Sequence, residues 1–325
     1  MQRRQFTFTF AIASAAVACG TPVRAQPAWP DRPVRLILAH PAGSGVDSVA
    51  RVVSERISRN WGQQIVIENK PGGQNLIGAQ AAARSVPDGY TFYFATSAAL
   101  VTNVFLFKNL PYDPQKDFVL VGLIGRSPFA IMTNDKSPFR GIADLIARAK
   151  AEPGKVSVAN EGPKTFGGMI GRLFNSRAQI ETNLISYASV SIAVQDTMGG
   201  HTDALIADVA SSVQLIKQGR LRMLAVTSAK RLAEYDKVPA LAELLPGFEM
   251  TGWMSVVAPT GTPREALQRF SRDLDAALLD KDTAERIRAL GPVPEAGGPE
   301  HLAAFMQAER SRWEVLSKEI GVLPE

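Results

Sequence analysis

The residues best suited to chemistry lie in one short loop between an apolar run and an amphipathic segment. They are Ala42, Gly43, Ser44, Gly45 and Asp47. Residues 34–39 predict a strand, and apolar residues at helical spacing predict a helix over 48–60. A helix N-terminus leaves about four backbone N–H groups unpaired and carries roughly half a positive charge, which favours a bound anion. Asp47 suits a capping role that holds the loop in place; a simple turn that needs glycine is the alternative interpretation.

A second loop, residues 160–166, precedes a predicted helix at 167–176 and repeats this arrangement. We expect Lys164, Thr165 and Phe166 to approach the same anion from the opposite side. The alternative is a solvated surface loop, which is the usual environment of a lysine.

Four further polar residues follow predicted strands at their C-terminal ends. They are Thr96, Ser97, Tyr187 and Asp208. Ligands of open α/β sheets bind at this end of the strands, so we expect these side chains to contact the far end of a ligand. Taken singly, a residue of this kind more often has a structural role.

Catalytic and cofactor motifs are absent from the sequence. The three histidines, at positions 40, 201 and 301, lack metal-ligand spacing, and no nucleophile or phosphate-loop motif occurs. Gly43 and Gly45, with Ser48 in the third position, form an incomplete dinucleotide fingerprint. We therefore expect no metal, no cofactor and no catalysis. An exported hydrolase that uses Ser44 or Ser97 is the alternative from another functional class.

The first 25 residues have the features of an export signal. Arg3 and Arg4 precede an apolar run over 6–18, and residues 23–25 form a cleavage site. The arginine pair also fits the twin-arginine route. Cys19, the only cysteine, lies within this segment, and we do not expect it to carry a lipid anchor. The sequence thus predicts a periplasmic protein.

The expected mature chain is close to neutral. It contains 33 basic and 31 acidic residues, a net charge of +2, without a polybasic run. Nucleic-acid-binding proteins present a basic face, so we expect no nucleic-acid partner.

Strand-like and helix-like segments alternate along the chain, which is typical of an α/β fold. We expect one lobe from residues 26–125 and 228–325 and a second lobe from 126–227. The chain would cross between them twice, and a ligand bound in the cleft between such lobes can close them by a hinge motion.

Several motifs in one order resemble the Bug-type (TctC-like) solute-binding proteins of tripartite tricarboxylate transporters. The motifs are Pro41-Ala42-Gly43-Ser44-Gly45-Val46-Asp47, Glu68-Asn69-Lys70-Pro71-Gly72, Pro87-Asp88-Gly89-Tyr90-Thr91, Leu110-Pro111-Tyr112-Asp113-Pro114, Leu224-Ala225-Val226-Thr227 and Gly261-Thr262-Pro263. The resemblance covers essentially the whole mature chain.

This resemblance implies a type II periplasmic-binding-protein fold and a receptor for small carboxylates. It implies that the first and second loops grip one carboxylate, largely through backbone N–H groups. The membrane subunits of the transporter are the implied partners, and we expect a monomer. Presentation of the ligand to a membrane sensor kinase is an alternative with the same fold and pocket.

The sequence departs from the family pattern mainly around the second loop. Pro163 and Lys164 interrupt the usual loop motif, Gly168 stands where histidine is common, and Gln74-Asn75 replaces a Gly-Gly pair. We expect the general grip on a di- or tricarboxylate, an amino acid or an aromatic acid. The identity of the ligand does not carry over from the family.

Overall fold

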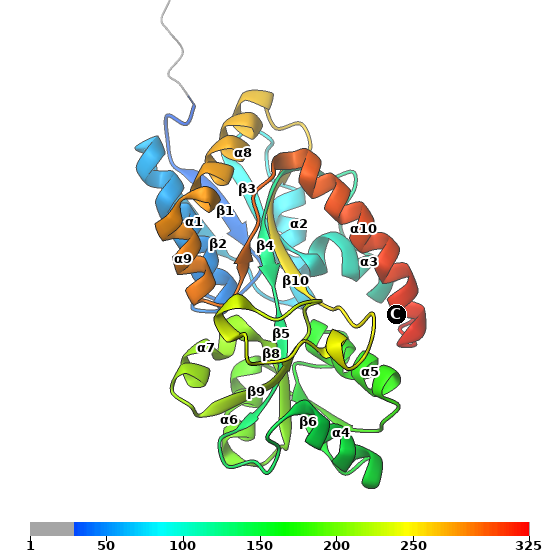
Figure 1. The fold of residues 1–325 in the computed structure, drawn as a ribbon. Coiled ribbons are helices and arrows are strands. Elements are labelled where there is room, and N and C mark those ends of the chain that lie inside the picture. The colour runs from blue at the N-terminus through cyan, green and yellow to red at the C-terminus, as the bar shows by residue number, and fades with distance from the viewer. Residues whose placement is uncertain (1–28, 325) are drawn as a thin grey trace, which may run out of the picture.

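The computed structural model describes residues 29–324, which fold into two α/β lobes stacked end to end (Figure 1). The export signal and Cys19 lie outside the described residues. Among residues 29–324, no helix combines the length and the hydrophobicity needed to cross a bilayer.

The first lobe is built on a six-stranded sheet with the order β11-β4-β10-β3-β1-β2. Its strands are β1 (Val34–Leu38), β2 (Ile65–Asn69), β3 (Thr91–Thr96), β4 (Phe118–Ser127), β10 (Gly252–Pro259) and β11 (Val293–Pro294). Strand β1 runs parallel to β2 and β3, and β10 lies antiparallel to β3 and β4. Every residue of β3 and β10 is buried, as expected for central strands covered on both faces.

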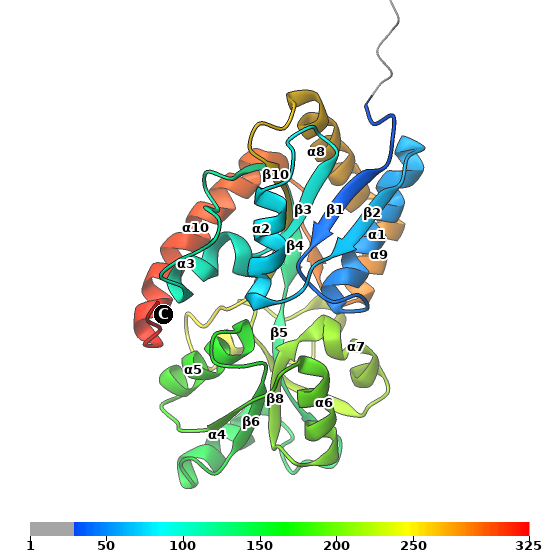
Figure 2. The same cartoon turned by 180° about the vertical axis from the view of Figure 1, so that it is seen from behind.

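Helices cover both faces of this sheet (Figures 1 and 2). They are α1 (Gly45–Trp61), α2 (Leu76–Ala83), α3 (Asn103–Leu106), α8 (Arg264–Leu279), α9 (Lys281–Ala289) and α10 (Gly298–Glu319). Helix α1 begins with Ser44 as its N-cap and ends at Gly62, whose φ of 66° closes the last turn. Between β3 and β4, a π-helical turn over Ala98–Thr102 continues into α3.

The second lobe is built on a five-stranded sheet with the order β7-β6-β8-β5-β9. Its strands are β5 (Phe129–Asn134), β6 (Ser157–Asn160), β7 (Asn183–Ser186), β8 (Ala204–Asp208) and β9 (Leu221–Val226). Its helices are α4 (Ile142–Ala151), α5 (Phe166–Ala178), α6 (Val190–Gly199) and α7 (Val209–Lys217). Strand β6 runs parallel to both β7 and β8, so the C-terminal ends of these three strands meet at one edge, facing the first lobe.

The chain passes from the first sheet to the second through Pro128, which is the single residue between β4 and β5. After β9, Leu232 and Ala240 belong to the apolar cluster of the second sheet, and the first sheet resumes at Gly252. The expected boundary between residues 227 and 228 stays a prediction. The apolar residues beyond β9 form no strand or long helix, so the sequence pattern does not indicate in which lobe they pack.

Thr227 ties the two crossings together. Its N–H donates to the carbonyl of Phe129 at 2.9 Å, and its hydroxyl donates to the carbonyl of Met250 at 2.7 Å. The Phe129 N–H donates in turn to the Thr227 hydroxyl at 3.2 Å. Because Thr227 is fully buried, these bonds are shielded from water and fix the two crossings relative to each other.

Candidate functional site

A cavity of about 510 Å³ lies between the two lobes. Ten of the twelve site residues predicted from the sequence line it. They are Ala42, Gly43, Ser44, Gly45, Thr96, Ser97, Lys164, Thr165, Phe166 and Asp208. The lining comes from both lobes, so a molecule in this cavity contacts both at once.

Asp47 does not line the cavity but organises the first loop from behind. Its side chain is 1% exposed and accepts hydrogen bonds from the N–H of Gly43 at 2.9 Å and from Asn69 Nδ2 at 2.9 Å. Arg51 binds the same carboxylate through two nitrogens, at 2.8 and 3.1 Å. These partners hold the pKa of Asp47 below its usual value against the opposing effect of burial. These bonds fix the loop at the start of α1.

The second loop is fixed by its own polar residues. Asn160 Oδ1 accepts the N–H of Gly162 at 2.8 Å, and Thr165 caps α5 by accepting the N–H of Gly168 at 3.3 Å. The Lys164 ammonium lies 5.4 Å from the centre of the Phe107 ring, which does not belong to the cavity lining. Lys164 thus lines the cavity while its ammonium group contacts a ring outside the lining.

Four helices begin at this cavity. The first residues of α1, α5 and α6 lie in its lining, as do the N-cap Asp208 and Ser211 of α7, and α1 belongs to the other lobe than the rest. At the start of α6, the Ser189 side chain makes no capping hydrogen bond. The N–H groups of this first turn are therefore not occupied by a capping side chain. Four convergent N-termini create a positive potential without any cationic side chain.

Two carboxyl groups also face the cavity. Asp208 caps α7 by accepting the N–H of Ser211 at 2.8 Å, and burial raises its pKa despite this bond. Burial and the nearby charge of Asp208 raise the pKa of Glu161 to about 7. On the first lobe, burial lowers the pKa of His40 to about 4, so this imidazole is neutral at pH 7.

Glu161 should make the unliganded protein less stable as the pH rises. The pKa of this carboxyl group is about 7 in the folded chain, and its ordinary value is 4.5. Between these two pH values the folded chain keeps the proton, whereas the unfolded chain has released it. Stability from this group is therefore lost from about pH 4.5 to 7, by at most about 3 kcal/mol. We expect Glu161→Gln to unfold at higher urea concentration than the natural protein at pH 7.5, with a smaller difference at pH 5. An equal pH dependence in both proteins would contradict this.

Tyr187, predicted to contact the ligand, points elsewhere. Its hydroxyl donates to Asp196 on α6 at 2.7 Å, and it does not line the cavity. The next residues, 188–191, line the cavity in its place. The direction of a side chain depends on the exact end of the strand, which the sequence pattern does not define.

Sequence reasoning missed part of the first lobe's wall. Gln74 and Asn75 line the cavity with φ values of 53° and 73°, a conformation that side chains other than glycine rarely adopt. Asn103 lies beside them; its Nδ2 donates to the carbonyl of Gln74 at 3.0 Å, and its buried Oδ1 has no hydrogen-bond partner among residues 29–324. The replacement of a glycine pair by Gln74-Asn75 was the available signal.

The lobes are in contact across the cleft, as in a closed receptor. A Cβ atom on Gly45 would lie 2.7 Å from the Cβ of Ala210 in α7. The rings of Phe166 and Trp313 lie 5.5 Å apart, and Arg177 on α5 pairs with Glu319 on α10. Figures 1 and 2 show the ends of α5 and α10 side by side.

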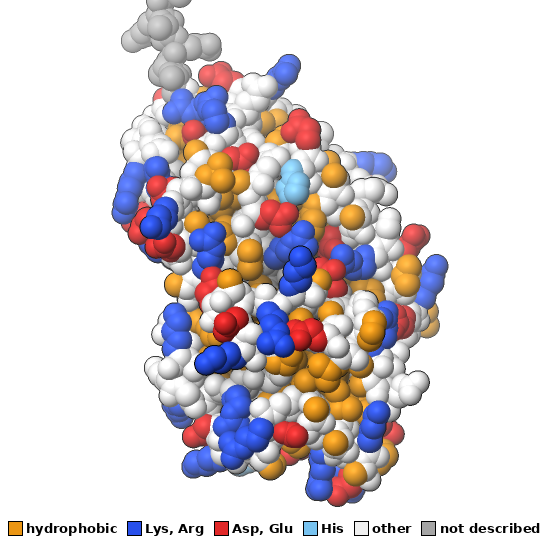
Figure 3. All heavy atoms as spheres, viewed as in Figure 1, with side chains coloured by type: hydrophobic (Ala, Val, Ile, Leu, Met, Phe, Trp, Pro, Cys, Tyr) orange, Lys and Arg blue, Asp and Glu red, His pale blue; other side chains and the backbone are white. Residues whose placement is uncertain are grey.

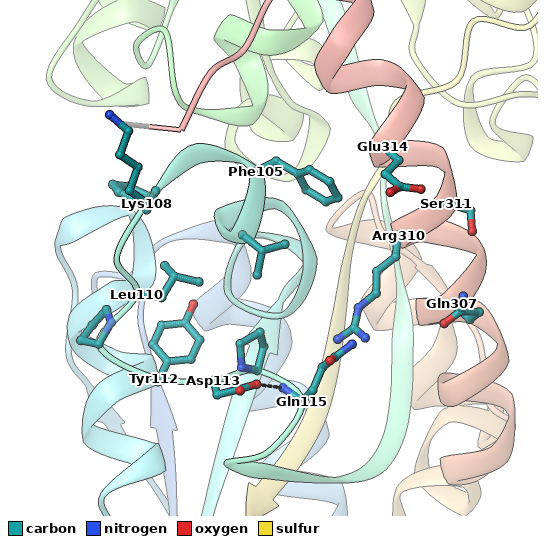
Figure 4. Close-up of a pocket in the computed structure, with 14 residues that line it drawn as sticks. Phe105, Lys108, Leu110, Tyr112, Asp113, Gln115, Gln307, Arg310, Ser311 and Glu314 are labelled. Atoms are coloured by element: carbon teal, nitrogen blue, oxygen red, sulfur yellow. Dashed lines mark hydrogen bonds between the residues drawn. The ribbon is translucent and has the colours of Figure 1, made fainter.

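A larger hollow of about 880 Å³ lies on the outside of the first lobe. Figure 4 shows Arg310 extending from α10 towards the loop that carries Asp113 and Gln115. None of the predicted site residues lines this groove, and all of its lining belongs to one lobe. A ligand there would not bridge the lobes, so we take the interlobe cavity as the candidate site.

The site lacks the groups of a hydrolase or a metal enzyme. Ser44 Oγ accepts the N–H of Asp47 as a helix cap, and His40 Nδ1 has no hydrogen-bond partner in the described part of the chain. Residues 29–324 contain no group of three metal-ligating side chains. Figure 3 shows acidic and basic side chains interspersed on one face of the molecule.

Comparison with known proteins identifies relatives along almost the whole chain. A family model described as the tripartite tricarboxylate transporter family receptor matches residues 49–322. A protein encoded in the tcbD-tcbE intergenic region of Pseudomonas sp. (strain P51) is 35% identical over 307 residues, which cover 94% of this chain and 91% of that protein.

Two solved structures have the same fold. Rpa4515 of R. palustris, solved with adipate, is 31% identical with a TM-score of 0.86, over 91% of this chain and 100% of that chain. The periplasmic binding protein BugD is 30% identical with a TM-score of 0.82, over the same shares. These matches confirm the predicted two-lobe fold and the resemblance to Bug-type proteins, which are solute-binding proteins rather than enzymes. The chain therefore belongs to the receptor family of the tripartite tricarboxylate transporters.

Proposed function

We propose that this protein is an exported receptor that captures a small carboxylate between its lobes and delivers it to a tripartite tricarboxylate transporter. The observation that carries the proposal is the convergence of four helix N-termini, contributed by both lobes, on one interlobe cavity. Such a site binds a carboxylate through backbone N–H groups and needs no salt bridge. The adipate in Rpa4515 supports a carboxylate as the ligand class.

Within this proposal, eight of the predicted site residues act at the ligand. Gly43 to Gly45 and Thr165 to Phe166 hold the carboxylate, while Thr96, Ser97 and Asp208 contact the rest of the molecule. A ligand that bonds both lobes stabilises the closed state to the extent that it binds this state more tightly than the open one. Release to membrane subunits in the periplasm follows when the lobes separate.

We expect purified mature protein to be stabilised by at least one acid in a panel of mono-, di- and tricarboxylates and amino acids. A ligand at 100 times its dissociation constant adds about 2.7 kcal/mol to the stability. Thermal-shift measurements, followed by calorimetric titration of each hit, test this. Inorganic sulfate at the same ionic strength is the control for a general salt effect. If no acid shifts the melting temperature beyond the sulfate control, the proposal is wrong.

A further inference from the structure

Glu161 and Asp208 stand side by side at one wall of the interlobe cavity. Strands β6 and β8 are parallel neighbours, with Val158 opposite Ala204 and Ala159 opposite Leu205. Glu161 directly follows β6, and Asp208 is the last residue of β8. The two carboxyl groups therefore emerge from adjacent strands at the same edge of the sheet, and both line the cavity.

These two residues, here called the acidic wall, also lie close to the loop that precedes α1 in the first lobe. Asp208 Oδ1 lies 3.3 Å from the position that a Cβ atom on Gly45 would occupy, at the start of α1. A carboxylate bound by the first turn of α1 is thus within a few ångströms of the Asp208 carboxyl group. Two negative groups at this separation repel each other strongly in a site shielded from water.

Cationic side chains do not offset these acids inside the cavity. Lys164 is the one lysine or arginine in the described lining, and its ammonium lies over the Phe107 ring at the rim. His40, the remaining titratable group of the lining, is neutral at pH 7 because burial lowers its pKa. A second carboxylate on the ligand would therefore meet two acids and no inward-directed cation.

We propose that the ligand is a carboxylate that also carries an ammonium group, with an α-amino acid as the best match, and that Glu161 and Asp208 bind the ammonium. The proposal rests on the carboxylate-receptor function above. The helix N-termini take the carboxylate of such a zwitterion, and the acidic wall takes its cationic group. In an α-amino acid these two groups are adjacent, as are the α1 N-terminus and Asp208.

The proposal fixes the sign of the pH dependence. Glu161 shares the cavity with Asp208, Lys164 and His40, and its raised pKa of about 7 means that it ionises across the neutral range. An ammonium group favours the ionised acid, so affinity for an amino acid rises from pH 5.5 to 8. A second carboxylate on the ligand favours the protonated acid, and affinity for a dicarboxylate falls over the same range.

Matched pairs that differ only in the amino group test the proposal. Suitable pairs are aspartate and succinate, glutamate and glutarate, 2-aminoadipate and adipate, and leucine and 4-methylpentanoate. Calorimetric titration of the full mature protein at pH 7.5 should show at least one pair in which the amino acid binds at least about 30-fold more tightly. When the titration is repeated at pH 5.5, 6.5 and 8, the affinity for this amino acid should increase from the lowest pH to the highest.

Isosteric variants assign the effect to the acidic wall. Asp208→Asn keeps a helix cap of equal quality, and Glu161→Gln keeps the shape, so both variants should fold. We expect each to lower the preference for the amino acid by at least about tenfold and to weaken its pH dependence. Glu181→Gln, a change of the same type at an exposed acid of the second lobe outside the cavity, should leave both unchanged.

The possible failures are distinguishable. If a member of the panel binds but the desamino partner binds as tightly as the amino acid, or more tightly at low pH, the ammonium site is wrong and the carboxylate receptor stands. If no member of any pair binds but another acid of the carboxylate panel does, the ammonium site is wrong and the carboxylate receptor stands; if no acid of that panel binds, the receptor function itself fails. An amino-acid preference that survives in both variants would assign the ammonium to other residues and overturn the role of Glu161 and Asp208.

Discussion

Replacement of Gly45 by valine is expected to abolish ligand binding while both lobes remain folded. A Cβ atom at this position would lie 2.7 Å from the Ala210 Cβ and 3.3 Å from the Ala210 carbonyl carbon. Apolar carbons prefer a separation of about 3.5–4.0 Å, so the lobes must move apart to accept the side chain. Because Gly45 and Ala210 belong to different lobes, the clash opposes closure and leaves the interior of each lobe intact.

We expect the affinity of the Gly45→Val protein for its best ligand to fall by at least about 100-fold, or about 2.7 kcal/mol. Gly141→Val is the matched control, because Gly141 also stands at the start of a helix and a Cβ atom there meets nothing within 4 Å. Melting temperatures of the unliganded variants check that they fold, and calorimetry measures the affinity.

A compensating pair of substitutions sharpens this test. Gly45→Ala introduces only the clashing Cβ atom, and Ala210→Gly removes its nearest partner. We expect the double variant to regain most of the affinity that Gly45→Ala loses. Undiminished affinity in Gly45→Val, or no recovery in the double variant, would show that this contact does not limit closure.

Replacement of Asp47 by alanine is expected to have the largest effect on stability. The Asp47 carboxylate is buried and accepts hydrogen bonds from Gly43, Asn69 and Arg51. Its removal leaves the Gly43 N–H without this acceptor and the Asn69 amide with the His40 carbonyl alone, while the exposed Arg51 side chain is hydrated. A buried group left unsatisfied costs about 1–3 kcal/mol. We expect a decrease of about 3 kcal/mol in the free energy of unfolding and a disordered first loop with weakened ligand binding.

Asp144 offers a control on a similar motif. It accepts the N–H groups of Arg140 and Gly141 at the start of α4, but it is exposed. Asp144→Ala should therefore cost only about 1 kcal/mol, the usual value of a helix cap. Urea denaturation of both variants at pH 7 measures the difference. Equal losses would mean that burial of the Asp47 network adds nothing to its stability.

Acid should remove the stabilisation that Asp47 supplies. Its pKa in the folded chain lies below the ordinary value of 3.8, so the contribution is complete above this value and is lost as the pH falls through the folded pKa. This sign is opposite to that of Glu161.

The sequence predicted the first half of the site because local patterns define it. An apolar strand, glycines in a turn, and apolar residues at helical spacing leave one arrangement for residues 34–61, and the capping role proposed for Asp47 agrees with its bonds to Gly43 and Arg51. The same logic located Thr165 at the start of α5. In both cases the information lies within about twenty consecutive residues.

The rest of the site depends on geometry between distant segments. Tyr187 was misplaced because its partner, Asp196, lies on the following helix and draws the ring away from the cavity. Gln74 and Asn75 adopt a left-handed backbone conformation, which the sequence analysis did not predict. The acidic character of the cavity arises from the adjacency of β6 and β8, and the sequence alone did not reveal that Glu161 stands beside Asp208.

The buried hydrogen bonds of Thr227 have a consequence for any partner of this protein. Because one residue bonds to both crossings, at Phe129 and at Met250, neither connection can lengthen or twist independently of the other. A change in the angle between the lobes would therefore bend both crossings together. A membrane partner that touches both lobes would sense from that angle only whether the lobes are closed or open. It would not distinguish which molecule they enclose. Chemical discrimination would then reside wholly in the receptor, and one partner would serve receptors with different cargo.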